Sequence, residues 1–284
     1  MRNKTRVADA TVRLLGRARY EVLPTGTIED KLLEHVPVAR PLTVTASPGK
    51  GLEPTLDLTE RLTGHGYVVT PHLAARMVRD KAELGEICDR LTGKGITSVF
   101  VPGGDADPPG GYADALSLLE DLAELGNPFT HVGITGYPES HPTITDDVTI
   151  QSMWDKRRYA THVVSNLTFD PKALAAWVRR MRARGISMPL LLGLPGPVDR
   201  TKLLSMAGKI GVGESTRFLA KHKGTFARLA APGGFTGEKF LLTCAAELAA
   251  PELGLEGLHV FTFNQVAETE TWHRELLERL TSGH

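Results

Sequence analysis

The stretch SVFVPGGD, residues Ser98–Asp105, decides the fold class together with the pattern that follows it. A short β-rich run, Ser98–Val101, is stopped by a proline and two glycines, which predicts a strand followed by a loop. Tyr112–Leu125 then places leucines at three-residue steps, which predicts an amphipathic helix. The sequence therefore contains a strand–loop–helix unit, the repeating part of parallel α/β folds.

The same unit recurs along the chain, with helical patterns such as Lys172–Arg184 and Gly237–Leu248 between β-rich runs. The expected strands are Arg19–Leu23, Leu42–Thr45, Tyr67–Thr70, Ser98–Val101, His131–Thr135, His162–Asn166, Pro189–Gly193 and Leu258–Thr262. This alternation predicts one domain, residues 1–284, folded as a single (β/α)₈ TIM barrel. The long interval from Pro195 to Gly237 predicts an extra helix at about Glu214–Leu229, before the last strand.

Composition excludes several classes of protein. The 284 residues are 41% hydrophobic, enough for a large core, and 33 basic side chains balance 33 acidic ones. Nucleic-acid and polybasic membrane binders need a basic surplus, so neither is expected. Cys88 and Cys244 cannot form a disulfide framework, and no stretch approaches a membrane span of about 20 apolar residues. We expect a cytoplasmic protein that binds a small molecule; a homo-oligomer remains compatible with the sequence.

Chemistry in such barrels sits at the C-terminal ends of the strands. Glu21 lies in the first strand, and a carboxylate buried there should have a raised pKa, as a general acid near neutrality needs. Alternatively, Glu21 pairs with an arginine or lysine across the mouth. Asp105 follows the fourth strand and could point into the mouth, or could merely cap the helix expected near Tyr112.

Further polar residues follow other strands. Tyr137–Pro142 is stiffened by two prolines, so Tyr137 could stack on a heteroaromatic ring, although a rigid turn explains the segment equally well. The glutamate and histidine of this segment lack a third ligand, so no metal site is predicted. Asn166 and Asn264 could hydrogen-bond the polar edge of a pterin-like ring, or could hydrogen-bond the backbone of their own loops.

Taken in order, these segments resemble the methylenetetrahydrofolate reductase family over most of the chain. Tyr137–Pro142 is similar to the family's tyrosine-proline-glutamate-any-histidine-proline motif, the most specific of the matches. Weaker matches are Pro71–Leu73, Gly104–Asp105, Phe169–Asp170 and Thr262–Asn264. The resemblance implies a barrel that reduces 5,10-methylenetetrahydrofolate to 5-methyltetrahydrofolate.

The resemblance also implies roles for individual residues. Glu21 would be the general acid that opens the bridged folate, and Asp105 would hydrogen-bond the pterin and stabilise the cation. Folate contacts would come from Asn166, which falls where the family has glutamine, from Asn264, and from Gln265, which replaces a family arginine. The positions that match the family's flavin side are Thr45, His72, Gly104, Tyr112, Tyr137 and Lys156.

Departures from the family pattern concern the cofactor. Gly103 replaces an arginine that faces the FAD phosphates, and Tyr159–Thr161 stands where the family has alanine-glycine-alanine. Each lost arginine–phosphate contact removes about 1.5–3 kcal/mol. FAD is therefore doubtful, and we expect NAD(P)H, with NADH favoured, to pass hydride directly to the folate. A usual FAD-dependent reductase and a non-catalytic folate-binding barrel remain open. A lyase or aldolase barrel is disfavoured because no strand end carries a Schiff-base lysine or a phosphate loop.

Overall fold

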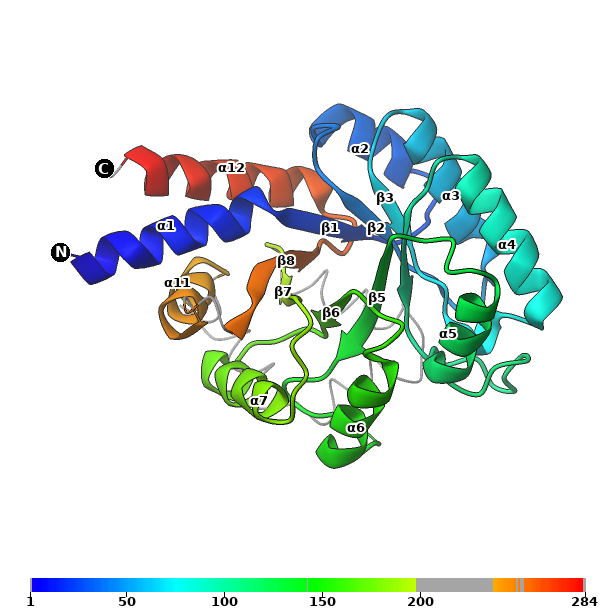
Figure 1. Cartoon of the computed structure of the whole chain (residues 1–284). Helices are drawn as coiled ribbons and strands as arrows, with labels where there is room; N and C mark the ends of the chain where they lie inside the picture. The colour runs from blue at the N-terminus through cyan, green and yellow to red at the C-terminus, as the bar shows by residue number, and fades with distance from the viewer. Residues whose placement is uncertain (1, 142, 198–236, 249, 251–252, 283–284) are drawn as a thin grey trace.

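A computed structural model describes residues 2–141, 143–197, 237–248, 250 and 253–282. Eight parallel strands form a nearly closed barrel in the order β3-β2-β1-β8-β7-β6-β5-β4, with helices on the outside (Figure 1). The strands are β1 Ala18–Val22, β2 Leu42–Val44, β3 Val69–Pro71, β4 Ser98–Val101, β5 His131–Gly136, β6 His162–Ser165, β7 Leu190–Pro195 and β8 Leu255–Phe261. The predicted (β/α)₈ barrel is confirmed.

The ring closes between β3 and β4, the two ends of this order. His72 and Phe100 form a parallel bridge, and the Leu73 amide donates to the Phe100 carbonyl over 2.8 Å. Below the bridge the Thr70 hydroxyl donates to Ser98 Oγ over 2.9 Å. This seam therefore joins the two strands with fewer backbone contacts than a regular ladder provides.

The helices that cover the outside of the barrel are α1 Arg2–Gly16, α2 Ile28–His35, α3 Glu53–Gly64, η1 Ala75–Met77, α4 Lys81–Gly93, α5 Ala115–Glu124, α6 Asp146–Lys156, α7 Pro171–Ala183, α11 Gly237–Leu248 and α12 Val266–Ser282. An aspartate side chain caps the N-terminus of α4, of α5 and of α7. The Asp114 carboxylate accepts the amides of Leu116 and Ser117, so the cap of α5 is Asp114 and not Asp105. Asp170 caps α7 as its sequence position predicts.

Several boundaries differ from the sequence prediction, and two of these differences have a clear physical reason. The helix expected from Tyr112 begins at Ala115, because its cap is Asp114. Strand β3 begins at Val69, because the preceding Tyr67 turns its hydroxyl to backbone carbonyls of α2 and its C-terminal cap. The extra helix expected at 214–229 lies outside the described residues.

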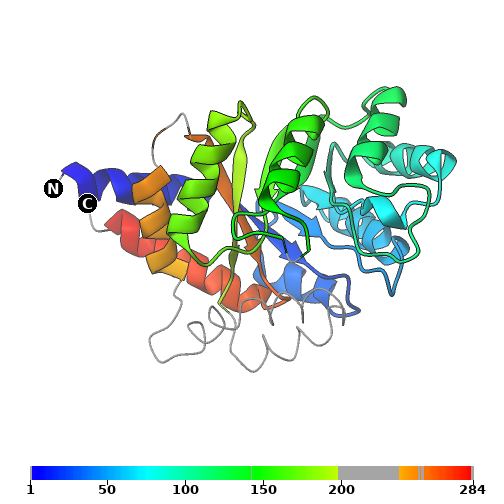
Figure 2. The same ribbon diagram turned by 90° about the horizontal axis from the view of Figure 1, so that it is seen from below.

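Helix α1 precedes the barrel and was not predicted. Its buried residues Ala10, Thr11, Leu14 and Leu15 recur at helical spacing, so the signal was present in the sequence. In Figures 1 and 2 the blue α1 lies beside the red α12 and the orange α11, and α1 contacts both. These three helices bring the first and last described parts of the chain together.

Alternation along β1 decides which side chains enter the barrel. Tyr20 points outward, since its hydroxyl donates to Glu270 of α12 over 2.7 Å. Its neighbours Arg19 and Glu21 therefore face the interior. Other interior positions are also polar, namely Thr43, Thr70, Ser98, His162 and His259, all of them buried. The inside of this barrel thus carries many polar side chains, and an apolar layer between strands and helices encloses it.

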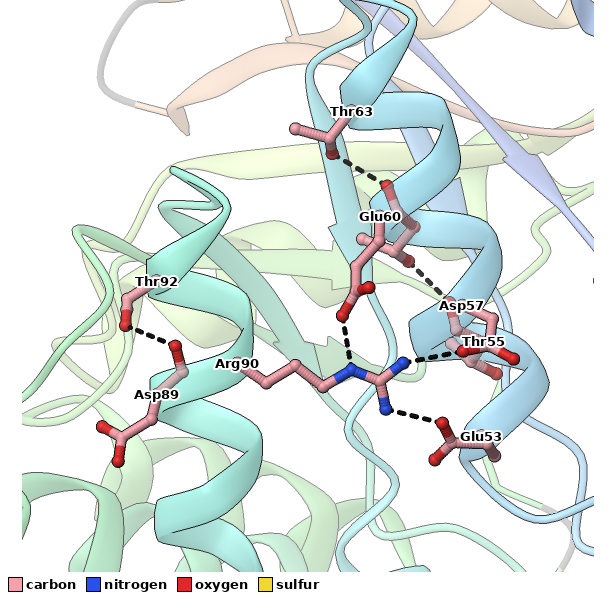
Figure 3. A network of polar contacts seen from close by, with 9 residues as sticks. Glu53, Thr55, Asp57, Glu60, Thr63, Asp89, Arg90 and Thr92 are labelled. Atoms are coloured by element: carbon pink, nitrogen blue, oxygen red, sulfur yellow. Dashed lines mark hydrogen bonds and ion pairs between the residues drawn. The ribbon is translucent and has the colours of Figure 1, made fainter.

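One polar cluster on the outside ties α3 to α4 (Figure 3). Arg90 of α4 forms ion pairs with three carboxylates of α3: Glu53 and Asp57, each at 2.7 Å, and Glu60. Each guanidinium nitrogen contacts a different carboxylate, which uses the fixed fork geometry of arginine. The cluster fixes the packing of two neighbouring helices.

Candidate active site

Glu21 lies near the C-terminal end of β1 with its side chain 12% exposed. Its Oε2 atom is 2.8 Å from His259 Nε2, on the adjacent strand β8. His72 Nε2, from the end of β3, lies 3.5 Å from the same oxygen, at the outer limit of a hydrogen bond, and has no other hydrogen-bond partner among the described residues. Three strands thus bring two imidazoles onto one carboxylate oxygen.

The electrostatics of Glu21 differ from the sequence prediction. Burial raises the pKa of this carboxyl, but the close approach of His259 and His72 lowers it more, to about 2. Without substrate, Glu21 is therefore an ionised carboxylate, and the predicted raised pKa is wrong for this state. The sequence could show that Glu21 is buried but not that two histidines contact it.

Aromatic rings form the floor around this carboxylate. The ring of Phe100 lies 4.7 Å from that of His72 and 6.4 Å from that of His259, and Phe261 packs against His259 at 4.9 Å. The His259 side chain is only 1% exposed, and burial lowers its pKa. Its Nδ1 atom has no hydrogen-bond partner among the described residues. The floor of the barrel therefore combines an apolar aromatic surface with the ionised carboxylate of Glu21.

Asn264 holds the segment that follows Glu21. Its Oδ1 accepts the Leu23 amide over 2.8 Å, and its Nδ2 donates to the Leu23 carbonyl over 3.0 Å and to Thr25 Oγ1 over 3.1 Å. Asn264 has a φ of 59° and its neighbour Phe263 a φ of 50°, both in the left-handed region. The sequence left open whether Asn264 contacts the substrate or fixes its own loop, and these hydrogen bonds favour the second interpretation.

Asn166 also bonds to its own loop, since its Oδ1 accepts the Leu167 amide over 2.8 Å. Thr45 continues β2 beside β1, where its amide donates to the Val22 carbonyl over 2.9 Å. Gln265 precedes α12, and its amide donates to the Thr262 carbonyl over 2.8 Å. These three residues lie at the strand ends, as expected, and their substrate or cofactor roles stay predictions.

Asp105 lies on a loop that packs against the chain around η1. Gly104 has a φ of 82°, and a Cβ on it would come within 2.9 Å of Ala74 Cβ. The Arg76 amide donates to the Gly103 carbonyl over 2.9 Å, and the Gly110 amide donates back to the Arg76 carbonyl over 2.9 Å. The backbone of Asp105 is therefore held in place, while its exposed side chain makes no hydrogen bond to a described residue.

The Tyr137–His141 segment after β5 is also fixed by its own side chains. Glu139 Oε1 accepts the amides of Phe169 and Asp170 at the start of α7, the latter over 2.8 Å. The rings of Tyr137 and His141 pack edge to face at 4.8 Å. Sequence reasoning missed the role of Glu139, because its partners lie 30 and 31 residues away.

Two residues assigned to the cofactor are placed elsewhere. The buried Tyr112 donates its hydroxyl to Asp121 of α5 over 2.8 Å. Lys156 is only 6% exposed, on the buried face of α6 with Thr149, Ile150 and Met153. Burial lowers the pKa of Lys156 to about 8, and it has no ion pair with a described residue. The structure does not bring either residue into contact with Glu21 or His72.

The described residues contain no group of three or more histidine, cysteine, aspartate or glutamate side chains placed to hold a metal ion. Within the same part of the chain, no helix combines the length and the apolar character that crossing a membrane requires.

A carboxylate held by two imidazoles thus lies at the strand ends of a (β/α)₈ barrel, where barrels of this fold carry their active sites. The chain belongs to the methylenetetrahydrofolate reductase family, whose model matches residues 32–212. That match covers His72, Asp105 and the Tyr137–His141 segment. Glu21 and β8 lie outside it, so their assignment rests on the geometry above.

Solved structures with similar folds include 2,3-dimethylmalate lyase, a PEP mutase/isocitrate lyase superfamily member. It is 13% identical, with 97% of this chain and 87% of that chain covered and a TM-score of 0.51. Another is 3-dehydroquinate dehydratase from Geobacillus kaustophilus HTA426, 12% identical, with 94% and 91% covered and a TM-score of 0.50. At such low identity these likenesses concern the barrel fold alone.

Proposed function

We propose that this protein reduces 5,10-methylenetetrahydrofolate to 5-methyltetrahydrofolate, with hydride passing directly from NAD(P)H to the folate. NADH is the favoured hydride donor, and we expect the protein to act in the cytoplasm. The observation that carries the proposal is the placement of Glu21, a carboxylate on an aromatic floor at the barrel mouth of a family member. A flat pterin fits such a floor by stacking.

In the proposed reaction Glu21 gives a proton to N10 of the folate, the bond between N10 and the bridging methylene breaks, and N5 becomes an iminium. Hydride from the nicotinamide then adds to the methylene carbon and leaves a methyl group, so each turnover consumes one proton and one hydride. Glu21 is ionised in the free protein. A bound pterin would exclude water from the carboxylate and raise its pKa, so proton uptake should accompany substrate binding.

Asp105 would stay ionised and stabilise the positive charge on N5. An anion aimed at developing charge lowers the barrier most when it is already fixed in place. The packing of Gly104 against Ala74 and the backbone bonds of Arg76 supply that fixation for the loop.

The residues that match the family's flavin contacts do not fit a pyrophosphate well. Gly103 offers no charge where the family has arginine, and the Tyr112 hydroxyl is already bound to Asp121. Lys156 is only 6% exposed, on the buried face of α6, so its ammonium is not open to a phosphate. These features support an enzyme without resident flavin, in which both substrates occupy the mouth together.

The first test is an absorbance spectrum of the purified protein, followed by NADH oxidation with and without 5,10-methylenetetrahydrofolate. We expect no flavin absorbance, folate-dependent oxidation, and sequential kinetics. Stoichiometric flavin with ping-pong kinetics would instead identify a usual family member. Folate binding with no oxidation of NADH or NADPH would identify a non-catalytic barrel and refute the proposed reaction.

A further inference from the structure

The contact between Glu21 and His259 joins strands that are adjacent in the barrel but 238 residues apart in sequence. The N–O distance of 2.8 Å is that of a charge-assisted hydrogen bond. Only Oε2 takes part, since both His259 and the more distant His72 approach this oxygen. The other oxygen, Oε1, accepts no hydrogen bond from a described residue.

The surroundings of His259 determine which ring nitrogen carries the proton. With the proton on Nδ1, the Nε2 lone pair would face the carboxylate, and a buried N–H would lack an acceptor among the described residues. With the proton on Nε2, the ring donates to Oε2, and only a lone pair is left without a partner. Phe100 and Phe261 pack around the ring and exclude the water that a charged imidazolium would need. The geometry therefore dictates a neutral ring with the proton on Nε2.

We propose that His259 is the positioning residue for the proton donor: it holds Oε2 of Glu21 by its Nε2–H group and leaves Oε1 as the oxygen that faces the folate. The inference deepens the proposed function and rests on it only where catalysis is measured. The same bond stabilises the carboxylate that remains after proton transfer, which makes Glu21 a stronger acid toward the weakly basic N10. The other titratable or charged groups near the pair are Arg19 on β1, His72 directly after β3, and His162 on β6.

His259→Phe removes the N–H donor and keeps a flat apolar ring. Loss of one hydrogen bond to a charged group should raise the pKa of Glu21 by about one to two units. His259→Gln keeps an N–H at the reach of Nε2 and should restore most of the wild-type value. His162→Leu is the matched control, because it alters another buried interior histidine that does not contact Glu21. The Glu21 carboxyl can be followed by carbon NMR in glutamate-labelled protein, with Glu21→Gln to assign its signal.

The second readout is the pH profile of kcat for folate-dependent NADH oxidation, which reports the pKa of Glu21 in the substrate complex. The pH above which kcat declines should move upward in His259→Phe by about one to two units and should stay in place in His162→Leu. A carboxyl titration that is the same in wild type and His259→Phe would overturn the inference. A titration that moves while the kinetic profile does not would leave the hydrogen bond intact as a finding and refute Glu21 as the acid.

Should His259→Phe not fold, the wild-type protein still decides the matter. Nitrogen NMR at neutral pH should show His259 as the neutral tautomer protonated on Nε2. A ring protonated on Nδ1 alone could not donate to Oε2 and would refute the positioning role.

Discussion

His162 allows the free-energy cost of placing a positive charge inside the barrel to be measured. This histidine of β6 is 8% exposed, its Nδ1 lies 2.9 Å from Thr161 Oγ1, and its Nε2 has no hydrogen-bond partner among the described residues. Burial, with Arg19, His131 and His259 nearby, lowers the pKa of His162 from 6.5 to about 3. The folded protein therefore holds this ring neutral over a pH range in which the unfolded chain protonates it.

The sign of the effect follows from proton binding. Between pH 6.5 and about 3 the unfolded chain binds one more proton at this site than the folded protein, so stability falls as the pH falls. The loss is about 1.4 kcal/mol per pH unit, or about 2.7 kcal/mol between pH 6.5 and 4.5. His162→Leu removes this contribution. The free energy of unfolding of the variant should therefore exceed that of the wild type by about 2.7 kcal/mol more at pH 4.5 than at pH 7.

Guanidinium unfolding of both proteins at pH 7 and 4.5 measures this difference. Val164→Ala, an apolar change at the next inward-facing position of β6, is the control, and it should lower stability equally at both pH values. An unchanged difference between His162→Leu and wild type across the two pH values would show that His162 is protonated in the fold, contrary to the reasoning.

Three further changes test other parts of the structure. Glu21→Gln should lower kcat at least about a hundredfold, because the amide cannot supply a proton, while folate binding stays measurable by calorimetry. Retained turnover would exclude Glu21 as the general acid. Asn264→Ala removes the three hydrogen bonds that fix Leu23 and Thr25. We expect kcat/KM to fall about tenfold or more, with a smaller change in melting temperature. Unchanged kinetics would show that these hydrogen bonds do not support the active site. Arg90→Met leaves three α3 carboxylates without their cation. We expect the free energy of unfolding, measured with urea, to fall by about 1–2 kcal/mol at low salt and by less at high salt. Equal losses at both salt concentrations would show that Arg90 stabilises the protein by packing and not by its charge.

The fold could be predicted from the sequence because its signals are local. Alternation of β-rich runs with helical patterns indicated all the strands of the barrel, and the Lys172–Arg184 pattern indicated α7. Boundaries were less predictable where a side chain outside the element sets them, as Tyr67 does before β3.

The site was predictable only in part. The position of Glu21 on the inner face follows from alternation along one strand. Its contact with His259 depends on the register between the first and last strands, which no local pattern contains. For the same reason the direction of the Glu21 pKa and the loop ties of Asn264 and Glu139 could not be obtained from the sequence.

The seam between β3 and β4 also affects how ligands reach the floor of the barrel. Local opening costs least where the fewest backbone hydrogen bonds must break. The seam rests on the His72–Phe100 bridge and its neighbouring bonds, so its amides, such as that of Leu73, should exchange with solvent before those within β1. We therefore expect the wall that carries His72 and adjoins the loop of Asp105 to open locally more often than the ladders on either side of β1.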